Sequence, residues 1–371
     1  MAIIISEITD SEQWDGFLTS QPRGHLLQSY EWGELNKYLG GHIYRLGALD
    51  NGRLVGAMLV LVAQVPLPLK VPGIHFNWLY CCRGPAVEKL DAPVLAALVE
   101  YAHSIARKEH AVVLRLEPNI ADGEPDVDDW LAAYCALGFH INPIAVHGRR
   151  SWVLDIRPDL DQLLAGFKMT WRQNVRGAER KGVVIREAKN DADFDAYYEL
   201  LKITSDRDAF FIHDKDYHRE ILRRFACKGD AVLYLAEHEG EAIAAKMLIR
   251  FGDCCWDMFG ASSNSKRNLK ATYLLQYRCF EWAKSKGCSY FDFRTIPEIL
   301  EPGEEMWGVY EYKKGFGGFS RLNIPTQDYV YRPLIYNAWR NFVELRRARR
   351  HSERKKVELE RAARGKSNKE E

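Results

Sequence analysis

The pattern of apolar and polar residues runs through the chain twice, with the same order of predicted elements in each half. In the first half, two β-rich runs at 42–49 and 54–61 flank a turn that ends at Gly52. The second half repeats this arrangement, with runs at 231–236 and 242–249 around a turn at Gly240. Short glycine-containing turns between such runs are typical of β-hairpins, so each half is predicted to contain one.

Each predicted hairpin is followed by the same series of elements. Helical periodicity precedes an apolar run in both halves, at 93–108 and 111–116 and again at 272–286 and 288–293. A short predicted helix then ends in Gly-Phe, at Gly138 and at Gly315. This order is similar to that of the GNAT acyltransferases, whose central sheet splays open to admit a thioester and an amine. We therefore expect an α/β (α+β) fold with two tandem GNAT-like acyltransferase domains; two generic α+β domains are the alternative.

The repeat predicts a first domain at 1–149 and a second at 150–319, with the chain returning to the first domain near 320–345. Residues 346–371 are predicted to continue a basic C-terminal helix into a partly disordered tail. Residues 331–371 carry nine arginines and four lysines against six glutamates. Such an excess of positive charge suits an anionic partner, either a nucleic acid or a membrane surface, or reflects only a solvated helix.

Composition narrows the class of protein. Hydrophobic residues make up 47% of the 371, which is ample for a packed core. No stretch approaches the ~20 apolar residues that span a bilayer, and the first residues lack the features of a signal peptide. The eight cysteines show no Cys-x-x-Cys spacing, and no cluster of metal ligands is visible. We therefore expect a cytoplasmic protein with reduced thiols, no transmembrane segment and no metal.

The loop that binds CoA in a typical GNAT enzyme is missing. That loop places glycines before the central helix, so that backbone N–H groups can approach a pyrophosphate closely. Here the second half reads Arg267-Asn268-Leu269-Lys270-Ala271, with lysine where glycine is needed, and the first half reads Leu90-Asp91-Ala92-Pro93. The sequence thus predicts acyl transfer from a donor other than CoA, without a cofactor.

Between the two repeats lies a basic stripe, formed by Lys168, Arg172, Arg176 and Arg180. A spacing of four residues places these side chains along one side of a helix. Such a stripe suits phosphate groups, of RNA or of a nucleotide diphosphate. The alternative is an exposed helix kept in solution by its arginines.

At this point the chain resembles the FemABX family of peptidoglycan-bridge aminoacyltransferases, over roughly residues 20–335. The motifs that carry the resemblance lie at 27–35, 168–183, 258–262, 273–277, 282–284, 290–293 and, most specifically, Gly308-Val309-Tyr310-Glu311-Tyr312-Lys313-Lys314-Gly315-Phe316-Gly317-Gly318. The resemblance implies two GNAT-like domains and transfer of an amino acid from aminoacyl-tRNA. The acceptor would be an amine of a UDP-linked or lipid-linked peptidoglycan precursor. The chain has no room for the helical arm of the longer members, so it matches the short form.

The resemblance also implies roles for particular residues. Lys313 matches the lysine that acts at the reacting carbonyl, with Tyr312 in place of a neighbouring aromatic; without the family, Lys313 and Lys314 would be surface lysines. Glu117 matches a proposed carboxylate base or is a strand-end glutamate without a catalytic role. The candidate precursor-binding residues are Lys37, Arg207, His213, Tyr217 and Phe259, of which His213 replaces an arginine and Phe259 a phenol.

Three other functions stay open from the sequence. One is a CoA-dependent N-acetyltransferase with an atypical loop. Another is a related acyltransferase of polysaccharide or natural-product assembly. The third is a non-catalytic RNA-binding protein, for which Lys313 would be dispensable.

Overall fold

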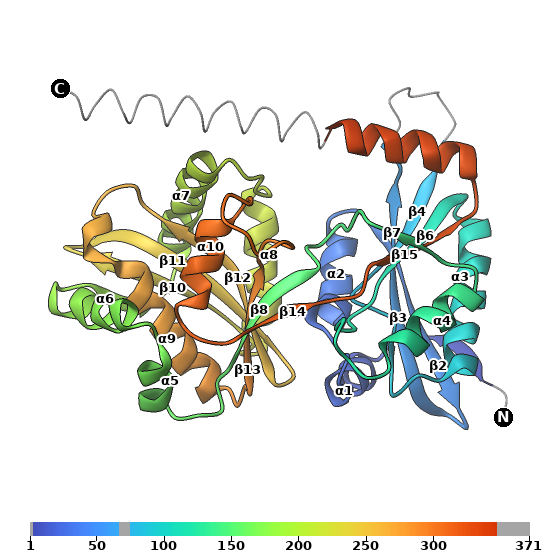
Figure 1. Ribbon diagram of the computed structural model, residues 1–371, viewed down its shortest axis with the longest axis horizontal. Helices are drawn as coiled ribbons and strands as arrows, with labels where there is room; N and C mark the ends of the chain where they lie inside the picture. The colour runs from blue at the N-terminus through green and yellow to red at the C-terminus, as the bar shows by residue number, and fades with distance from the viewer. Residues whose placement is uncertain (1–2, 67–74, 347–371) are drawn as a thin grey trace.

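The computed structural model describes residues 3–66 and 75–346, and its strands form two sheets that lie side by side (Figure 1). The first sheet has the order β1 (Ile4–Glu7), β2 (His42–Asp50), β3 (Arg53–Gln64), β4 (Asn77–Cys82), β6 (Ala111–Glu117), β15 (Thr326–Val330) and β7 (His140–Asn142), with β5 (Ala86–Val87) beside β3. The second sheet has the order β14 (Phe319–Leu322), β8 (Arg150–Asp155), β13 (Tyr290–Thr295), β12 (Cys254–Ser262), β11 (Glu241–Phe251), β10 (Ala231–His238) and β9 (Val184–Glu187).

The two sheets share one topology. Counted from β1 and from β9, each sheet begins with antiparallel strands. The second and third of these form a hairpin, β2–β3 or β10–β11. Each then contains a parallel pair, β4–β6 or β12–β13. The predicted tandem GNAT-like fold is therefore confirmed.

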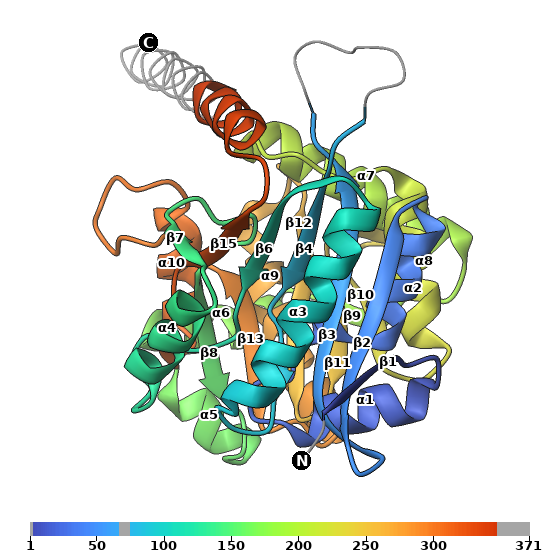
Figure 2. The same ribbon diagram turned by 90° about the vertical axis from the view of Figure 1, so that its right-hand side faces the viewer.

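Helices cover both faces of the sheets. Those of the first half are α1 (Ser11–Ser20), α2 (Tyr30–Tyr38), α3 (Ala92–Lys108) and α4 (Val127–Ala136), with the short 3-10 turn η1 (Leu26–Gln28). Those of the second half are α5 (Leu160–Gly166), α6 (Met169–Arg180), α7 (Asp191–Asp208), α8 (Lys215–Ala226), η2 (Arg267–Leu269), α9 (Ala271–Ser285) and α10 (Trp307–Lys314). Residues 333–346 are also helical. In Figure 2, α3 lies across the first sheet, and it buries Leu95, Leu98 and Ala102 at helical spacing.

One hydrophobic cluster belongs to both halves. It joins Trp14, Leu27 and Trp32 of the first half to Tyr197 and Ile221 of the second, all of them buried. At its edge, Glu31 on α2 forms ion pairs with Arg224 and Lys228, at 3.3 and 2.8 Å. The two halves therefore pack on each other through a continuous core, which fixes the walls of any site between them.

The chain crosses back to the first sheet near its end. β14 pairs with β8 in the second sheet, so that sheet extends past residue 319, and β15 then pairs with β6 and β7 in the first. We keep 1–149 and 150–319 as proposed domain boundaries. Of the basic tail predicted at 346–371, all but Arg346 lies outside the described residues. No helix in the described ranges is long and apolar enough to cross a membrane.

A buried ion pair fastens the returning strand. Arg115 on β6 donates two hydrogen bonds to Asp328 on β15, of 2.8 and 2.7 Å, and both side chains are less than a tenth exposed. Asn142 and the hydroxyl of Tyr336 donate to the same carboxylate, both at 2.8 Å. Both oxygens of the Asp328 carboxylate thus accept hydrogen bonds from protein donors.

We expect Asp328→Asn to lower the free energy of unfolding by about 3–5 kcal/mol, because it leaves the guanidinium of Arg115 buried without a counter-charge. Urea titration followed by circular dichroism measures this. The control is Glu88→Gln, which breaks the exposed pair with Arg53 and should change stability by less than about 0.5 kcal/mol. Equal unfolding midpoints for the two variants would show that the ion pair does not hold β15.

Candidate active site

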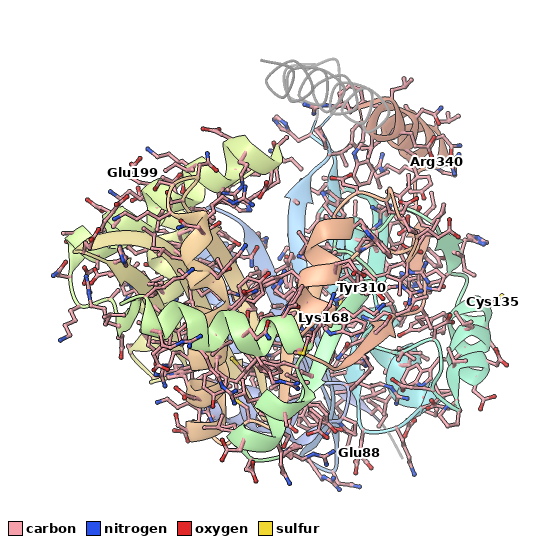
Figure 3. All side chains as sticks on the ribbon, turned by 60° about the vertical axis from the view of Figure 1, so that its left-hand side comes forward. Glu88, Cys135, Lys168, Glu199, Tyr310 and Arg340 are labelled. Atoms are coloured by element: carbon pink, nitrogen blue, oxygen red, sulfur yellow. The ribbon has the colours of Figure 1, made fainter. Side chains whose placement is uncertain are left out.

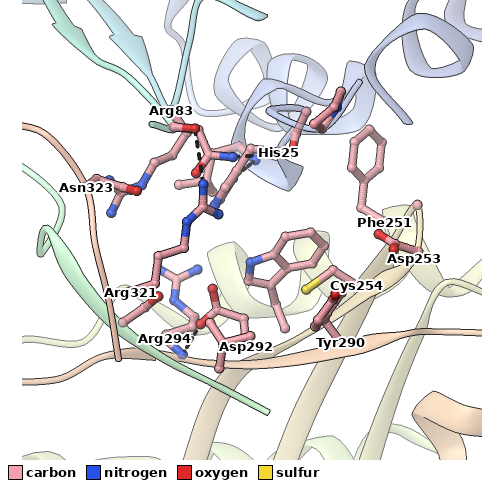
Figure 4. Close-up of a pocket in the computed structure, with 18 of the residues that line it drawn as sticks. His25, Arg83, Phe251, Asp253, Cys254, Tyr290, Asp292, Arg294, Arg321 and Asn323 are labelled. Carbon is pink, nitrogen blue, oxygen red and sulfur yellow. Dashed lines mark hydrogen bonds between the residues drawn. The ribbon is translucent and has the colours of Figure 1, made fainter. Parts of the chain in front are cut away.

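A cavity of about 590 Å³ lies between the two halves. Its first wall comes from the segment after α1 and from the ends of β4 and β6, and its second from β8, β13, β14 and the β11–β12 turn. The polar residues that line its inner part are His25, Arg83, Asn119, His147, Asp292, Arg294, Arg321 and Asn323, most of them drawn in Figure 4.

Three arginines converge on this cavity from both halves of the chain (Figure 4). Arg83 directly follows β4, while Arg294 lies near the end of β13, and both have a left-handed backbone with φ of 56° and 66°. Side chains other than glycine seldom adopt this conformation outside functional sites. Arg321 enters from β14. Beside them, burial raises the pKa of Asp292, and Arg294 and Arg321 partly oppose that rise.

Lys313 lies directly behind the wall of the cavity. It is the penultimate residue of α10, is 9% exposed, and donates a hydrogen bond of 2.7 Å to the carbonyl oxygen of Thr295, which lines the cavity. Burial lowers the pKa of Lys313 to about 8, with Asp257 and Asp292 opposing the repulsion from Lys246 and Arg294. The alternative of a surface lysine is therefore wrong for Lys313, although Lys314 is exposed and its stretch is helical.

A second buried lysine lies where the second sheet splays open. β12 and β13 pair only from Cys254 to Trp256 and then diverge. Beyond that point Lys246 on β11 forms an ion pair with Asp257 on β12 and a hydrogen bond with Gln276 on α9. The charges of Asp257 and Lys246 act on Lys313, so these groups form one polar cluster in the splay.

Tyr312 borders a smaller pocket of about 220 Å³ at the start of α9. Its hydroxyl donates to the carbonyl oxygen of Thr272 at 2.9 Å. Lys270, which stands where a CoA-binding loop has glycine, adopts a left-handed backbone with φ of 58°. Lys266 and Arg267 line the same pocket, next to a helix start that is not capped by a side chain. Lys266 is paired with Glu239 and Glu241, at 3.3 and 2.9 Å, so Arg267 and Lys270 are the cations here that favour an anion at the helix start.

Glu117 is not free to act as a base in the cavity. It is buried, and its carboxylate accepts hydrogen bonds from the hydroxyl of Tyr80 at 2.5 Å and from the backbone of Val146 and His147. Burial would raise the pKa of Glu117, but His147, Tyr80 and Arg83 hold it at about 2. His147 faces the cavity, so Glu117 acts on the site only through its neighbours.

His147 is held as a cation by this network. Burial would lower its pKa, but Cys82 and Glu117 raise it to about 9. The Nδ1 atom of His147 lies 2.7 Å from the hydroxyl of Tyr80, which in turn donates to Glu117. The ligand atoms of Cys82, Glu117 and His147 lie within 4.8 Å of one another, a set that suits a metal ion, but the Tyr80 hydroxyl already bridges them.

The structure brings three of the candidate precursor-binding residues together. His213 stacks on Tyr217 with ring centroids 4.0 Å apart, and buried His218 contacts both Tyr217 and Phe259. Burial raises the pKa of Tyr217 to about 12, and the charge of Arg294 opposes that rise.

Two other candidates are placed differently. Arg207 donates to the carbonyl oxygen of Ser262 at 2.9 Å, at the end of β12. Lys37 is nearly half exposed in an ion pair of 2.9 Å with Glu34, and neither it nor Arg207 lines the cavity.

The basic stripe follows α6, but it consists of three exposed cations rather than four. Lys168 precedes the helix and lies at the surface (Figure 3), and Arg176 and Arg180 are exposed farther along. Arg172 donates to the carbonyl oxygens of Ala165 and Phe167. Its guanidinium therefore contacts the end of α5, and its role in binding phosphate stays a prediction.

Comparisons with known proteins agree with this arrangement. The acetyltransferase (GNAT) domain model matches residues 166–314, and the FemAB family model matches residues 9–129. Lipid II:glycine glycyltransferase of Staphylococcus aureus (strain MRSA252) is 25% identical, with 89% of this chain and 93% of that protein covered.

The chain belongs to the FemABX family. The solved structure of FemX superposes with a TM-score of 0.80 at 22% identity, covering 90% of this chain and 99% of FemX. A tandem GNAT protein from the clavulanic acid biosynthesis pathway gives a TM-score of 0.55 at 14% identity, with 89% and 98% covered. The predicted family and the assignment to the acyltransferases are thereby confirmed.

The site of this FemABX member contains residues that sequence reasoning missed, namely Arg83, Lys246, Asp292, Arg294 and Arg321. One signal was available, because Asp292 and Arg294 alternate with Phe291 and Phe293 in an otherwise apolar strand. Charged residues within a buried strand indicate a special environment.

We expect Glu117→Gln to lower the pKa of His147 from about 9, because, of the two groups that favour the imidazolium, Cys82 and Glu117, the carboxylate is gone. NMR titration of the imidazole measures this, with His218, whose pKa is about 4, as the internal control. Because the folded pKa of His147 exceeds the unfolded value of about 6.5, the wild type should lose stability as pH rises from about 6.5 to 9, and the variant should lose less. An unchanged His147 titration would contradict the network.

Proposed function

We propose that this protein is an aminoacyltransferase that moves an amino acid from aminoacyl-tRNA to an amine of a peptidoglycan precursor peptide, in the formation of interpeptide bridges. The observation that carries this proposal is Lys313, a buried ammonium group placed at the splay of the second sheet and against the wall of the cavity. Family membership supports the substrate class, and the name of the Staphylococcus aureus relatives favours the lipid-linked precursor over the UDP-linked one.

The chemistry needs a positive group more than it needs a cofactor. The acceptor amine attacks the ester carbonyl of the aminoacyl-tRNA, an amide forms, and the ribose hydroxyl leaves with a proton. Negative charge develops on the carbonyl oxygen during the attack, and a fixed ammonium group stabilises it. With a pKa of about 8, Lys313 is mostly protonated at pH 7 and can also donate its proton.

Two groups of cations support a polyanionic donor. Lys266, Arg267 and Lys270 surround the pocket at the start of α9, where a GNAT enzyme would hold the pyrophosphate of CoA. The C-terminal end of α6, with Arg180, lies beside them, because Lys181 at that end donates to the carbonyl oxygen of Asn268 at 2.9 Å. An RNA acceptor end would contact both groups through its phosphates. The protein would then act in the cytoplasm, where charged tRNA is found.

We expect Lys313→Met to lower turnover about 10²–10³-fold, since it removes the group at the developing oxyanion. The full-length protein is incubated with charged tRNAs and with the UDP-linked and lipid-linked precursors, and products are identified by mass spectrometry. Lys314→Met is the control, because Lys314 is exposed one residue away on the same helix. Wild-type turnover by Lys313→Met would refute its assignment, and product formation from acetyl-CoA instead of charged tRNA would refute the proposed donor.

We also expect the advantage of the wild type over Lys313→Met to fall as pH rises through about 8. The protonated amine is the active form in this mechanism, and its fraction decreases above the pKa. The ratio of kcat/KM for the two proteins, measured between pH 6 and pH 10, removes the titration of the substrates from the comparison. A ratio that rises through pH 8 would instead make Lys313 a base.

A further inference from the structure

The end of the 590 Å³ cavity at which the three arginines lie contains one carboxylate, Asp292, while Asp253 lines the cavity away from them (Figure 4). Arg83 donates to the carbonyl oxygen of Gly148 at 2.6 Å and Arg321 to that of Asn119 at 3.3 Å, while the guanidinium of Arg294 reaches, among the described residues, only the sulfur of Met258. Each guanidinium has five N–H donors, so most of this capacity is unused.

Negative charge at this end is limited. Asp292 accepts from the backbone N–H of Arg294 and, in the described part of the chain, forms no ion pair within 4.0 Å with any of the three arginines. Arg321 has a further, longer contact of 3.5 Å with Glu124. Buried charge without a close partner is costly, so the cavity favours an anionic ligand.

An independent observation also points to a ligand with acceptor oxygens. Trp256 lines the cavity, is 5% exposed, and its indole Nε1–H has no hydrogen-bond partner among the described residues. Buried indole N–H groups usually find an acceptor. His25 adds another donor, because its Nδ1 atom accepts from the backbone of Leu27 and its ring proton must therefore lie on Nε2.

The cavity also offers an acceptor and an apolar wall, which distinguishes a peptide from a phosphate. The Oδ1 atom of Asn323, a residue 7% exposed, has no partner within the described ranges. Leu18, Leu27, Val153 and Phe251 form an apolar part of the lining. The last residue of a peptide presents a carboxylate to the donors, an amide N–H to such an acceptor and a side chain to an apolar wall. A phosphate group would place up to two negative charges beside Asp292 and would leave the apolar wall without a partner.

The position of the cavity connects it to the reaction centre. Thr295 lines the cavity, and its carbonyl oxygen accepts the hydrogen bond from Lys313 at 2.7 Å. A peptide that ends at the arginines would therefore lie next to the wall behind which Lys313 is placed. A cavity of this size is typical of sites that bury most of a small ligand.

We propose that this cavity is a carboxylate subsite in which Arg83, Arg294 and Trp256 bind the C-terminal carboxylate of the acceptor peptide and Asn323 accepts its last amide N–H. This inference rests on the proposed function for the identity of the peptide. The subsite selects acceptors with a free carboxyl terminus and fixes the distance between that terminus and the reacting amine.

Calorimetry on the full-length protein tests the subsite without tRNA or turnover. The probes are N-acetyl-Ala-Ala with a free carboxylate, the same dipeptide as its C-terminal amide, and inorganic phosphate. We expect the amide to bind at least about tenfold more weakly than the carboxylate, because charge-assisted hydrogen bonds are lost. Equal affinity of the two peptides, tighter binding of phosphate, or no binding of the carboxylate peptide at about 1 mM would overturn the subsite.

Variants assign the effect to this cavity. Trp256→Phe keeps an aromatic side chain but removes the indole N–H together with the pyrrole ring, and it should weaken the carboxylate peptide several-fold and the amide less. Arg294→Met should abolish the preference for the carboxylate. Arg157→Met is the matched control, since Arg157 is exposed, pairs with Asp155 and does not line the cavity. Loss of preference in the Arg157 variant as well would count against the assignment.

The outcomes separate this inference from the proposed function. If aminoacyl transfer occurs but acceptors with a carboxylate and with an amide terminus have the same KM, the subsite is wrong and the function stands. If the dipeptide binds with the expected preference but no aminoacyl transfer is found, the subsite stands and the function is wrong.

Discussion

The arrangement of the site depends on the apolar cluster that the two halves of the chain share. Trp14 and Leu27 from one half pack with Tyr197 and Ile221 from the other in a single buried core. Burial of this surface holds the end of β4 opposite β13 and β14, so that cations from separate domains are forced to face one cavity. The repulsion among Arg83, Arg294 and Arg321 is tolerated because the surrounding core offsets it.

In the site between the two halves, burial changes the pKa of each reactive group, and the charge of its neighbours decides whether that pKa is raised or lowered. Lys313 has only weak compensation and a pKa of about 8, whereas His147 lies against Cys82 and Glu117 and has a pKa of about 9. Glu117 is surrounded by donors, so it remains ionised. The same low dielectric thus yields an ammonium group that can lose its proton and an imidazolium that retains it.

The tandem fold was predictable from the sequence because its signals are local: glycine turns, helical periodicity and the repeated Gly-Phe ending. Lys313 was found through the family resemblance, and its burial could not be anticipated from two adjacent lysines. Arg83 and Arg294 were missed because their importance depends on a left-handed backbone and on neighbours more than 200 residues away. Arg172 matched the helical spacing of a phosphate-binding stripe, yet the end of α5 engages it, an outcome that spacing does not encode.

The return of the chain through β14 and β15 has a consequence for biosynthesis. The first sheet lacks the strand between β6 and β7 until residues 326–330 have been made, although β6 ends at Glu117. During translation Arg115 therefore stays without its carboxylate partner while the whole second domain emerges from the ribosome. The N-terminal domain, made first, is completed last, so a chain truncated before β15 exposes two unsatisfied strand edges to aggregation and to proteolysis.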